Sequence, residues 1–84
     1  AVIDISQTLQ VYPNPASAFV IVATENWQPE IVRMFDITGA TIPVEYSLLN
    51  QGTLQFNTTQ IPAGIYTIEL RDDQRVGFVR CVIE

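Results

Sequence analysis

Two prolines flanking one asparagine constrain this chain more than any other short segment. They are Pro13 and Pro15 around Asn14, within Val11-Tyr12-Pro13-Asn14-Pro15-Ala16-Ser17. Each proline fixes its own φ and moves the preceding residue out of the helical region. We therefore expect an extended corner that passes the chain from one strand to the next. The ring of Tyr12 is expected to close the end of a core, while its hydroxyl finds a hydrogen-bond partner.

The composition indicates one small domain with a packed core. A chain of 84 residues buries about 60–65% of its unfolded surface, and 48% of these residues are hydrophobic, which is too many for a disordered segment. The net charge is −5, with no lysine or histidine. This balance argues against nucleic acid or an anionic membrane as a partner. No window reaches the roughly 18 apolar residues of a membrane span, and no signal peptide is recognisable.

The first eight residues mix polar and aliphatic side chains without a clear alternation. We expect residues 1–8 to be a linker or lead-in that can become a strand at its end, and residues 9–84 to be the folded domain. This arrangement is typical of one domain taken from a longer protein.

Short apolar alternations separated by turn residues predict strands rather than helices. The expected strands are one that ends at the proline corner, followed by residues 18–23, 31–37, 41–47, 53–57, 65–70 and 76–83. We expect Phe19, Ile21, Leu54 and Phe56 to face inward. In the last strand we expect Val79, Cys81 and Ile83 on the inner face and Arg80 on the other. The strand containing Pro43 should lie at a sheet edge, because proline cannot donate to a ladder. Residues 48–52 and 71–75 are predicted turns. The fold class is an all-β, seven-stranded antiparallel immunoglobulin-like β-sandwich.

Two further corners have recognisable chemistry. Asp36 can accept hydrogen bonds from backbone amides two residues on, and Gly39 can take a positive φ, so they predict a turn. Pro62 and Gly64 predict a second rigid corner, in which glycine is free to become left-handed. Tyr66 follows that corner as closely as the tyrosine that ties the cross-over corner of immunoglobulin-like sandwiches.

Catalytic and metal-binding residues are scarce. Without histidine there is no Ser-His or Cys-His dyad, and the commonest metal ligand is missing. Asp72 and Asp73 are adjacent on a turn, where solvated charge is a commoner role than a calcium site. Cys81 lies in an apolar alternation and is expected to be a small buried hydrophobe. We expect no enzyme activity, cofactor or metal.

Trp27 is the only candidate for a small-ligand site. In its polar loop it can act as the stacking platform of a carbohydrate-binding or adhesion module, with Tyr46 as a second ring. The commoner alternative is a tryptophan folded over the end of the sandwich. Both interpretations stay open at the level of sequence.

Four motifs together resemble a known family. They are Leu9-Gln10-Val11-Tyr12-Pro13-Asn14-Pro15-Ala16-Ser17, Val32-Arg33-Met34-Phe35-Asp36-Ile37-Thr38-Gly39, Ile61-Pro62-Ala63-Gly64-Ile65-Tyr66 and Val79-Arg80-Cys81-Val82-Ile83. Their order and spacing resemble the type A C-terminal sorting domain of the type IX secretion system, also called the Por secretion system C-terminal domain. The match extends from Leu9 to Ile83. Arg80 stands where members often carry lysine, and residues 72–75 lack a glycine that is common in that hairpin.

The resemblance implies a secretion address in Bacteroidota rather than a catalyst. Cargo with a separate Sec signal reaches the periplasm, where the domain is recognised by the translocon and its shuttle proteins, and then crosses the outer membrane to the cell surface or the medium. A surface sortase usually cuts upstream of the domain, here within or ahead of residues 1–8, and joins the cargo to anionic lipopolysaccharide. The domain is then the substrate of the sortase.

We expect recognition to use the last strand and the end of the chain, through Arg80, Val82, Ile83 and Glu84. An exposed terminal strand could also pair with a partner or with a second copy of itself. The alternative is that the final strand matters only because its removal unfolds a marginal sandwich. The residues of the family motifs at the corners and the turn are expected to be structural: Tyr12, Pro13, Asn14, Pro15, Asp36, Gly39, Pro62, Gly64 and Tyr66.

Overall fold

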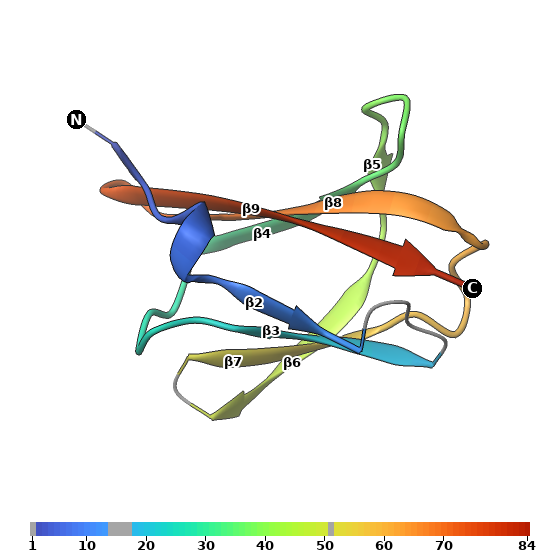
Figure 1. Ribbon diagram of the computed structural model, residues 1–84, viewed down its shortest axis with the longest axis horizontal. Helices are drawn as coiled ribbons and strands as arrows, with labels where there is room; N and C mark the ends of the chain where they lie inside the picture. The colour runs from blue at the N-terminus through green and yellow to red at the C-terminus, as the bar shows by residue number, and fades with distance from the viewer. Residues whose placement is uncertain (1, 14–17, 51) are drawn as a thin grey trace.

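Two β-sheets pack face to face in a computed structural model that describes residues 2–13, 18–50 and 52–84. One sheet has the strand order β1-β9-β8-β4-β5 and the other has the order β2-β3-β7-β6 (Figure 1). The elements are β1 (Ile3–Asp4), the 3₁₀-helix η1 (Ser6–Thr8), β2 (Gln10–Tyr12), β3 (Phe19–Ala23), β4 (Ile31–Phe35), β5 (Thr41–Ile42), β6 (Glu45–Asn50), β7 (Thr53–Asn57), β8 (Gly64–Arg71) and β9 (Arg75–Ile83). The predicted all-β sandwich is confirmed.

The core lies between the sheets and follows the period of two expected of strands. Its largest fully buried side chains come from both layers: Phe56, Val20 and Val22 from one sheet and Met34, Ile68, Leu70, Cys81 and Ile83 from the other. The predicted inward positions Leu54 and Phe56 of β7 are confirmed, with exposed fractions of 2% and 0%. Within the described residues no helix is long and apolar enough to cross a membrane.

Strand β3 faces the opposite way from the prediction. Phe19 is 39% exposed, whereas Val20 and Val22 are fully buried. Both faces of this strand are apolar, so hydrophobicity alone does not choose between them. The register with β7 decides, because Val20 pairs with buried Phe56 and a shift of one residue would reverse every side chain.

Tyr12 faces outward, as Phe19 does. It pairs directly with Ile21 on the outer face and is 46% exposed, so its ring does not close the core as expected. The prediction that the proline corner connects one strand to the next is confirmed, because β2 and β3 are antiparallel neighbours. The peptide bond between Tyr12 and Pro13 is cis. Asn14 and Pro15 lie outside the described residues.

The single strand expected over residues 41–47 is two strands in different sheets. Ile42 of β5 pairs with Met34 of β4, while Glu45 of β6 pairs with Asn57 of β7. Pro43 lies between them, where its missing N–H interrupts no ladder. Strand β6 continues to Asn50, through part of the predicted turn, with a register shift between Leu48 and Asn50.

The lead-in is part of the sheet, which differs from the linker expected from its composition. Strand β1 pairs in parallel with the start of β9, so the sheet is not wholly antiparallel. The amides of Ile3 and Ile5 donate to the carbonyls of Gln74 and Val76 at 2.9 and 2.8 Å, and the amide of Phe78 donates to Ser6 Oγ at 2.8 Å. These bonds occupy the outer edge of β9 as far as Phe78.

A glycine under the lead-in makes this packing possible. A Cβ built on Gly77 would lie 2.5 Å from Cδ1 of Leu9, well inside van der Waals contact. Leu9 is itself 9% exposed and belongs to the core. The approach of residues 5–9 to β9 therefore depends on the absence of a side chain at Gly77.

Candidate functional site

The last strand places the four predicted recognition residues on different sides of the sheet. Arg80 and Val82 lie on its outer face, and Val82 is 36% exposed. Ile83 is 2% exposed and packs in the core, whereas Glu84 follows the strand and is exposed. A partner of the folded domain can therefore reach the side chains of Arg80, Val82 and Glu84, but not that of Ile83.

Arg80 differs from the other cationic residues in its electrostatic surroundings. All four basic residues of the chain are arginines, and three of them form ion pairs: Arg33 and Arg71 with Glu69, and Arg75 with Asp72. Among the described residues Arg80 has no such pair. Across the ladder it faces Thr67 of β8, which is neutral. Its guanidinium is thus available to a carboxylate from outside.

The second corner is tied as the sequence predicts. The hydroxyl of Tyr66, a residue with 6% exposure, donates to the carbonyl of Pro62 at 2.6 Å. A Cβ at Gly64 would lie 3.5 Å from the ring of Tyr66, in ordinary contact. Gly64 is the first residue of β8 and not one of the glycines with positive φ, so the left-handed conformation expected there is wrong.

We expect Tyr66→Phe to lower the free energy of unfolding by about 1 kcal/mol, since it removes one hydrogen bond and leaves a carbonyl without it. Denaturant unfolding followed by circular dichroism measures the change. Tyr46→Phe is the matched control, because Tyr46 is 48% exposed. Equal stabilities of the two variants would show that the tie contributes nothing.

The turn at Asp36 has the predicted chemistry. Its Oδ1 accepts hydrogen bonds from the amides of Thr38 and Ala40 at 2.9 and 3.0 Å and from the hydroxyl of Thr38 at 2.6 Å. These donors, the hydroxyl of Thr38 first, lower the pKa of Asp36. Gly39 has a φ of 89°, a conformation that favours glycine. The carboxylate therefore holds a turn, in agreement with its predicted structural role.

Trp27 folds over the end of the sandwich and is held there from three directions. It is 2% exposed. Its Nε1 donates to Asp72 Oδ2 at 2.7 Å, its backbone amide donates to Thr24 Oγ1 at 3.1 Å, and the Arg75 guanidinium carbon lies 5.4 Å from its ring centroid. This confirms the commoner of the two predicted roles, and the ring offers no stacking surface.

Asp72 connects the hairpin to that tryptophan. Its Oδ1 accepts from the amides of Gln74 and Arg75 at 2.8 and 2.7 Å, while Oδ2 accepts from Trp27. The bond from Trp27 and those from the two amides lower the pKa of Asp72. Sequence reasoning missed this pair, because residues 45 positions apart give no local signal.

Because folding lowers the pKa of Asp72, its contribution to stability is present above the unfolded value, about 3.9, and is lost as pH falls through the folded value. We expect the difference in Tm between the wild type and Asp72→Asn to be largest at neutral pH and to shrink below about pH 4. Thermal unfolding by circular dichroism from pH 7 to pH 2 measures it. Asp73→Asn is the neighbouring control, and equal pH profiles for the two variants would contradict the prediction.

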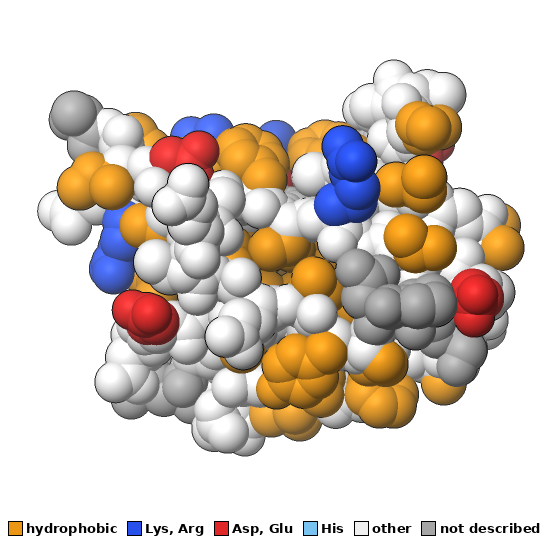
Figure 2. Space-filling model, viewed as in Figure 1, with side chains coloured by type: hydrophobic (Ala, Val, Ile, Leu, Met, Phe, Trp, Pro, Cys, Tyr) orange, Lys and Arg blue, Asp and Glu red, His pale blue; other side chains and the backbone are white. Residues whose placement is uncertain are grey.

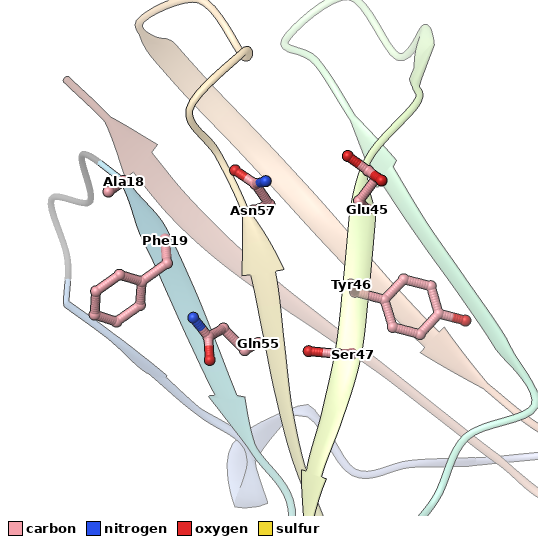
Figure 3. A pocket seen from close by; sticks show the side chains of 7 residues that line it. All are labelled: Ala18, Phe19, Glu45, Tyr46, Ser47, Gln55 and Asn57. Carbon is pink, nitrogen blue, oxygen red and sulfur yellow. The ribbon is translucent and has the colours of Figure 1, made fainter.

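A shallow hollow lies on the outer face of the second sheet, between β3 and β6 (Figure 3). Its walls and floor carry Phe19, Glu45, Ser47, Gln55 and Asn57. The ring of Tyr46 points away from it (Figure 3) and packs against Phe56, with 5.5 Å between ring centroids. Since Trp27 is buried elsewhere, the two rings do not form the stacking surface that the carbohydrate-binding interpretation required.

Metal-ligating side chains are not clustered in the described part of the chain. No cluster of three or more His, Cys, Asp or Glu side chains suited to a metal ion occurs among these residues. Cys81 is fully buried, and burial raises the pKa of its thiol, which disfavours the reactive thiolate.

The comparison with protein families decides among the interpretations. The family model described as the secretion system C-terminal sorting domain matches residues 10–84. The chain belongs to this family. The sorting domain is a signal for type IX secretion and not a known enzyme. No curated protein matches the chain.

Membership in this family gives the fold a biological context. The sorting domain implies interaction with the type IX secretion machinery and export to the cell surface or the medium. The match includes β2 through β9 and begins just after η1. It therefore covers both proline corners of the sequence, the Asp36 turn and the final strand.

Proposed function

We propose that this sorting domain is recognised as a folded unit in the periplasm by the type IX translocon and its shuttle proteins, and that it directs an attached cargo across the outer membrane. The observation that carries the proposal is the family match over residues 10–84. The folded sandwich supports it, because Arg80, Val82 and Glu84 are exposed along and beyond one strand.

We further propose that a surface sortase removes the domain by cutting within or ahead of residues 1–8 and joins the cargo to anionic lipopolysaccharide. Residues 3–6 are bound to the edge of β9. A cut inside this segment therefore requires it to leave the sheet first, since a protease needs an extended, accessible backbone. Pairing of a second copy of the chain with the edge of β9 up to Phe78 would require the same release.

The experiment is a fluorescent reporter with a Sec signal, fused through a native upstream linker to residues 1–84. It is expressed in a type IX-competent bacterium and in a strain without the translocon. We expect surface or medium fluorescence only in the competent strain, and mass spectrometry of the released reporter locates the cut. A folded fusion that stays periplasmic in both strains would refute the proposal.

Point variants separate recognition from folding. We expect Arg80→Ala and Glu84→Ala to keep the unfolding transition of the wild type, because exposed side chains contribute little to stability, and to reduce export of the reporter. Thr59→Ala, at an exposed residue outside β9, is the control. If both variants are exported normally, Arg80 and Glu84 are not needed for recognition, and the role of the final strand is structural only.

A further inference from the structure

The outer face of β9, β8 and β4 collects most of the positive charge of the domain. Met34, Ile68 and Cys81 lie on the inner side of these strands and are buried in the core. The residues that alternate with them along each strand therefore face outward. Pairing places Arg33 opposite Glu69 and Glu69 opposite Phe78. We call this surface the basic face and define it by Arg33, Ile65, Arg71, Phe78, Arg80 and Val82.

The basic face has the opposite sign of charge to the whole domain. The outward positions of β4, β8 and β9 carry three arginines and one carboxylate, Glu69, and Asp4 of β1 adds a second carboxylate at the edge beside Val76, which gives a local charge of three minus two, or +1, on a chain of net charge −5. In Figure 2 several arginine side chains are seen along the upper side of the molecule, over the layer that contains β9 and β8, with one acidic side chain beside them, and a further arginine lies at the left. This asymmetry gives the face an electrostatic preference for an acidic partner.

The carboxylate of Glu69 already forms ion pairs with two arginines of the basic face. This residue is 6% exposed, and its carboxylate lies 3.0 Å from Arg71 Nε and 3.8 Å from Arg33 Nε. The side chains of those two arginines remain 38% and 50% exposed. Arg80 has no ion pair within the described residues, so its guanidinium can bind a carboxylate of another molecule without breaking an internal one.

Apolar side chains lie between these charges. Phe78 is 42% exposed, and Ile65 and Val82, which pair across the ladder, are 43% and 36% exposed. Arginine beside exposed aromatic and aliphatic groups is the composition of a protein interface. A nucleic acid would instead require a longer row of cations to neutralise successive phosphates.

We propose that the basic face docks an acidic segment of a partner protein, one that carries carboxylates for Arg80 and Arg33 and aliphatic side chains for Phe78 and Val82. The proposal rests on the sorting function and describes the chemistry of the surface that the export machinery must present. It extends the recognition site from the end of the chain across three strands.

The direct test uses the purified domain and a synthetic peptide of glutamate and valine in equal numbers, with a peptide of lysine and valine as the control. We expect the acidic peptide alone to shift the amide resonances of residues 33, 67, 78, 80 and 82, and its affinity to fall as salt rises. Arg80→Gln should weaken binding about threefold to tenfold. Equal binding of both peptides, or shifts confined to other residues, would overturn the proposal.

Ser47→Glu is the matched control variant, since it makes the same change in net charge at an exposed residue of the other sheet. Equal weakening by Arg80→Gln and Ser47→Glu would mean that only the total charge matters, and would also overturn the proposal. In the export assay we expect Arg80→Gln to reduce surface reporter and Ser47→Glu to leave it unchanged.

The two proposals fail in different ways. If the wild-type reporter is not exported, the sorting function is refuted, and the peptide titration still decides whether the face binds acidic segments. If the wild type is exported and Arg80→Gln is exported equally well, sorting stands and docking through the basic face is refuted.

Discussion

Replacing Trp27 with alanine is expected to lower the free energy of unfolding by about 3–5 kcal/mol. The side chain is 2% exposed, and its removal leaves a cavity at the end of the sandwich and takes a hydrogen-bond donor from Asp72. A domain of this size has only about 5–15 kcal/mol of stability, so the variant should unfold at a much lower denaturant concentration. Circular dichroism is the suitable probe, because the only tryptophan is lost.

Ile37→Ala is the matched control for that substitution. It also removes an apolar side chain from a connection between strands, but Ile37 is 80% exposed, so the change should stay within about 0.5 kcal/mol. A loss below about 1 kcal/mol for Trp27→Ala would mean that the ring does not stabilise the fold, and would restore it as a candidate ligand platform.

Deleting residues 79–84 is expected to abolish both cooperative unfolding and export. Val79, Cys81 and Ile83 are 9%, 0% and 2% exposed, and all three would leave the core together with most of the β8–β9 ladder. Loss of several buried side chains exceeds about 5 kcal/mol. Calorimetry and the reporter assay measure the two effects.

A deletion of this kind cannot by itself reveal recognition, because an unfolded domain and an unrecognised one give the same export defect. Removal of Glu84 alone is the informative control, since it leaves every core residue of β9 in place. A truncated chain that still unfolds cooperatively would contradict the structural account of the final strand.

The sequence predicts best where local chemistry decides the structure. The turn at Asp36 and Gly39, the tie from Tyr66 to Pro62 and the inward face of β9 each depend on residues within a few positions of one another, and all three are confirmed. The edge position expected from Pro43 is confirmed, because β5 and β6 each lie at the edge of a sheet, but no local signal indicated that the chain changes sheets there.

The errors arise where pairing between distant strands decides the structure. Strand β3 is apolar on both faces, so its orientation depends on the register with β7, and Tyr12 follows from that register. The basic face was missed for the same reason. Arg33 of β4 meets Glu69 of β8 only because these two strands are neighbours, although the outward position of Arg80 was predicted from its own strand.

The parallel pairing of β1 with β9 has a mechanical consequence. A polypeptide pulled upstream of residue 2 would draw residues 3–6 along the axis of β9, so the bonds from Ile3, Ile5 and Phe78 would be strained in shear, all at once rather than one after another. Bonds loaded together in this way break at a rate set by the barrier to local unfolding. The force applied upstream of residue 2 would therefore set how fast this segment leaves the sheet.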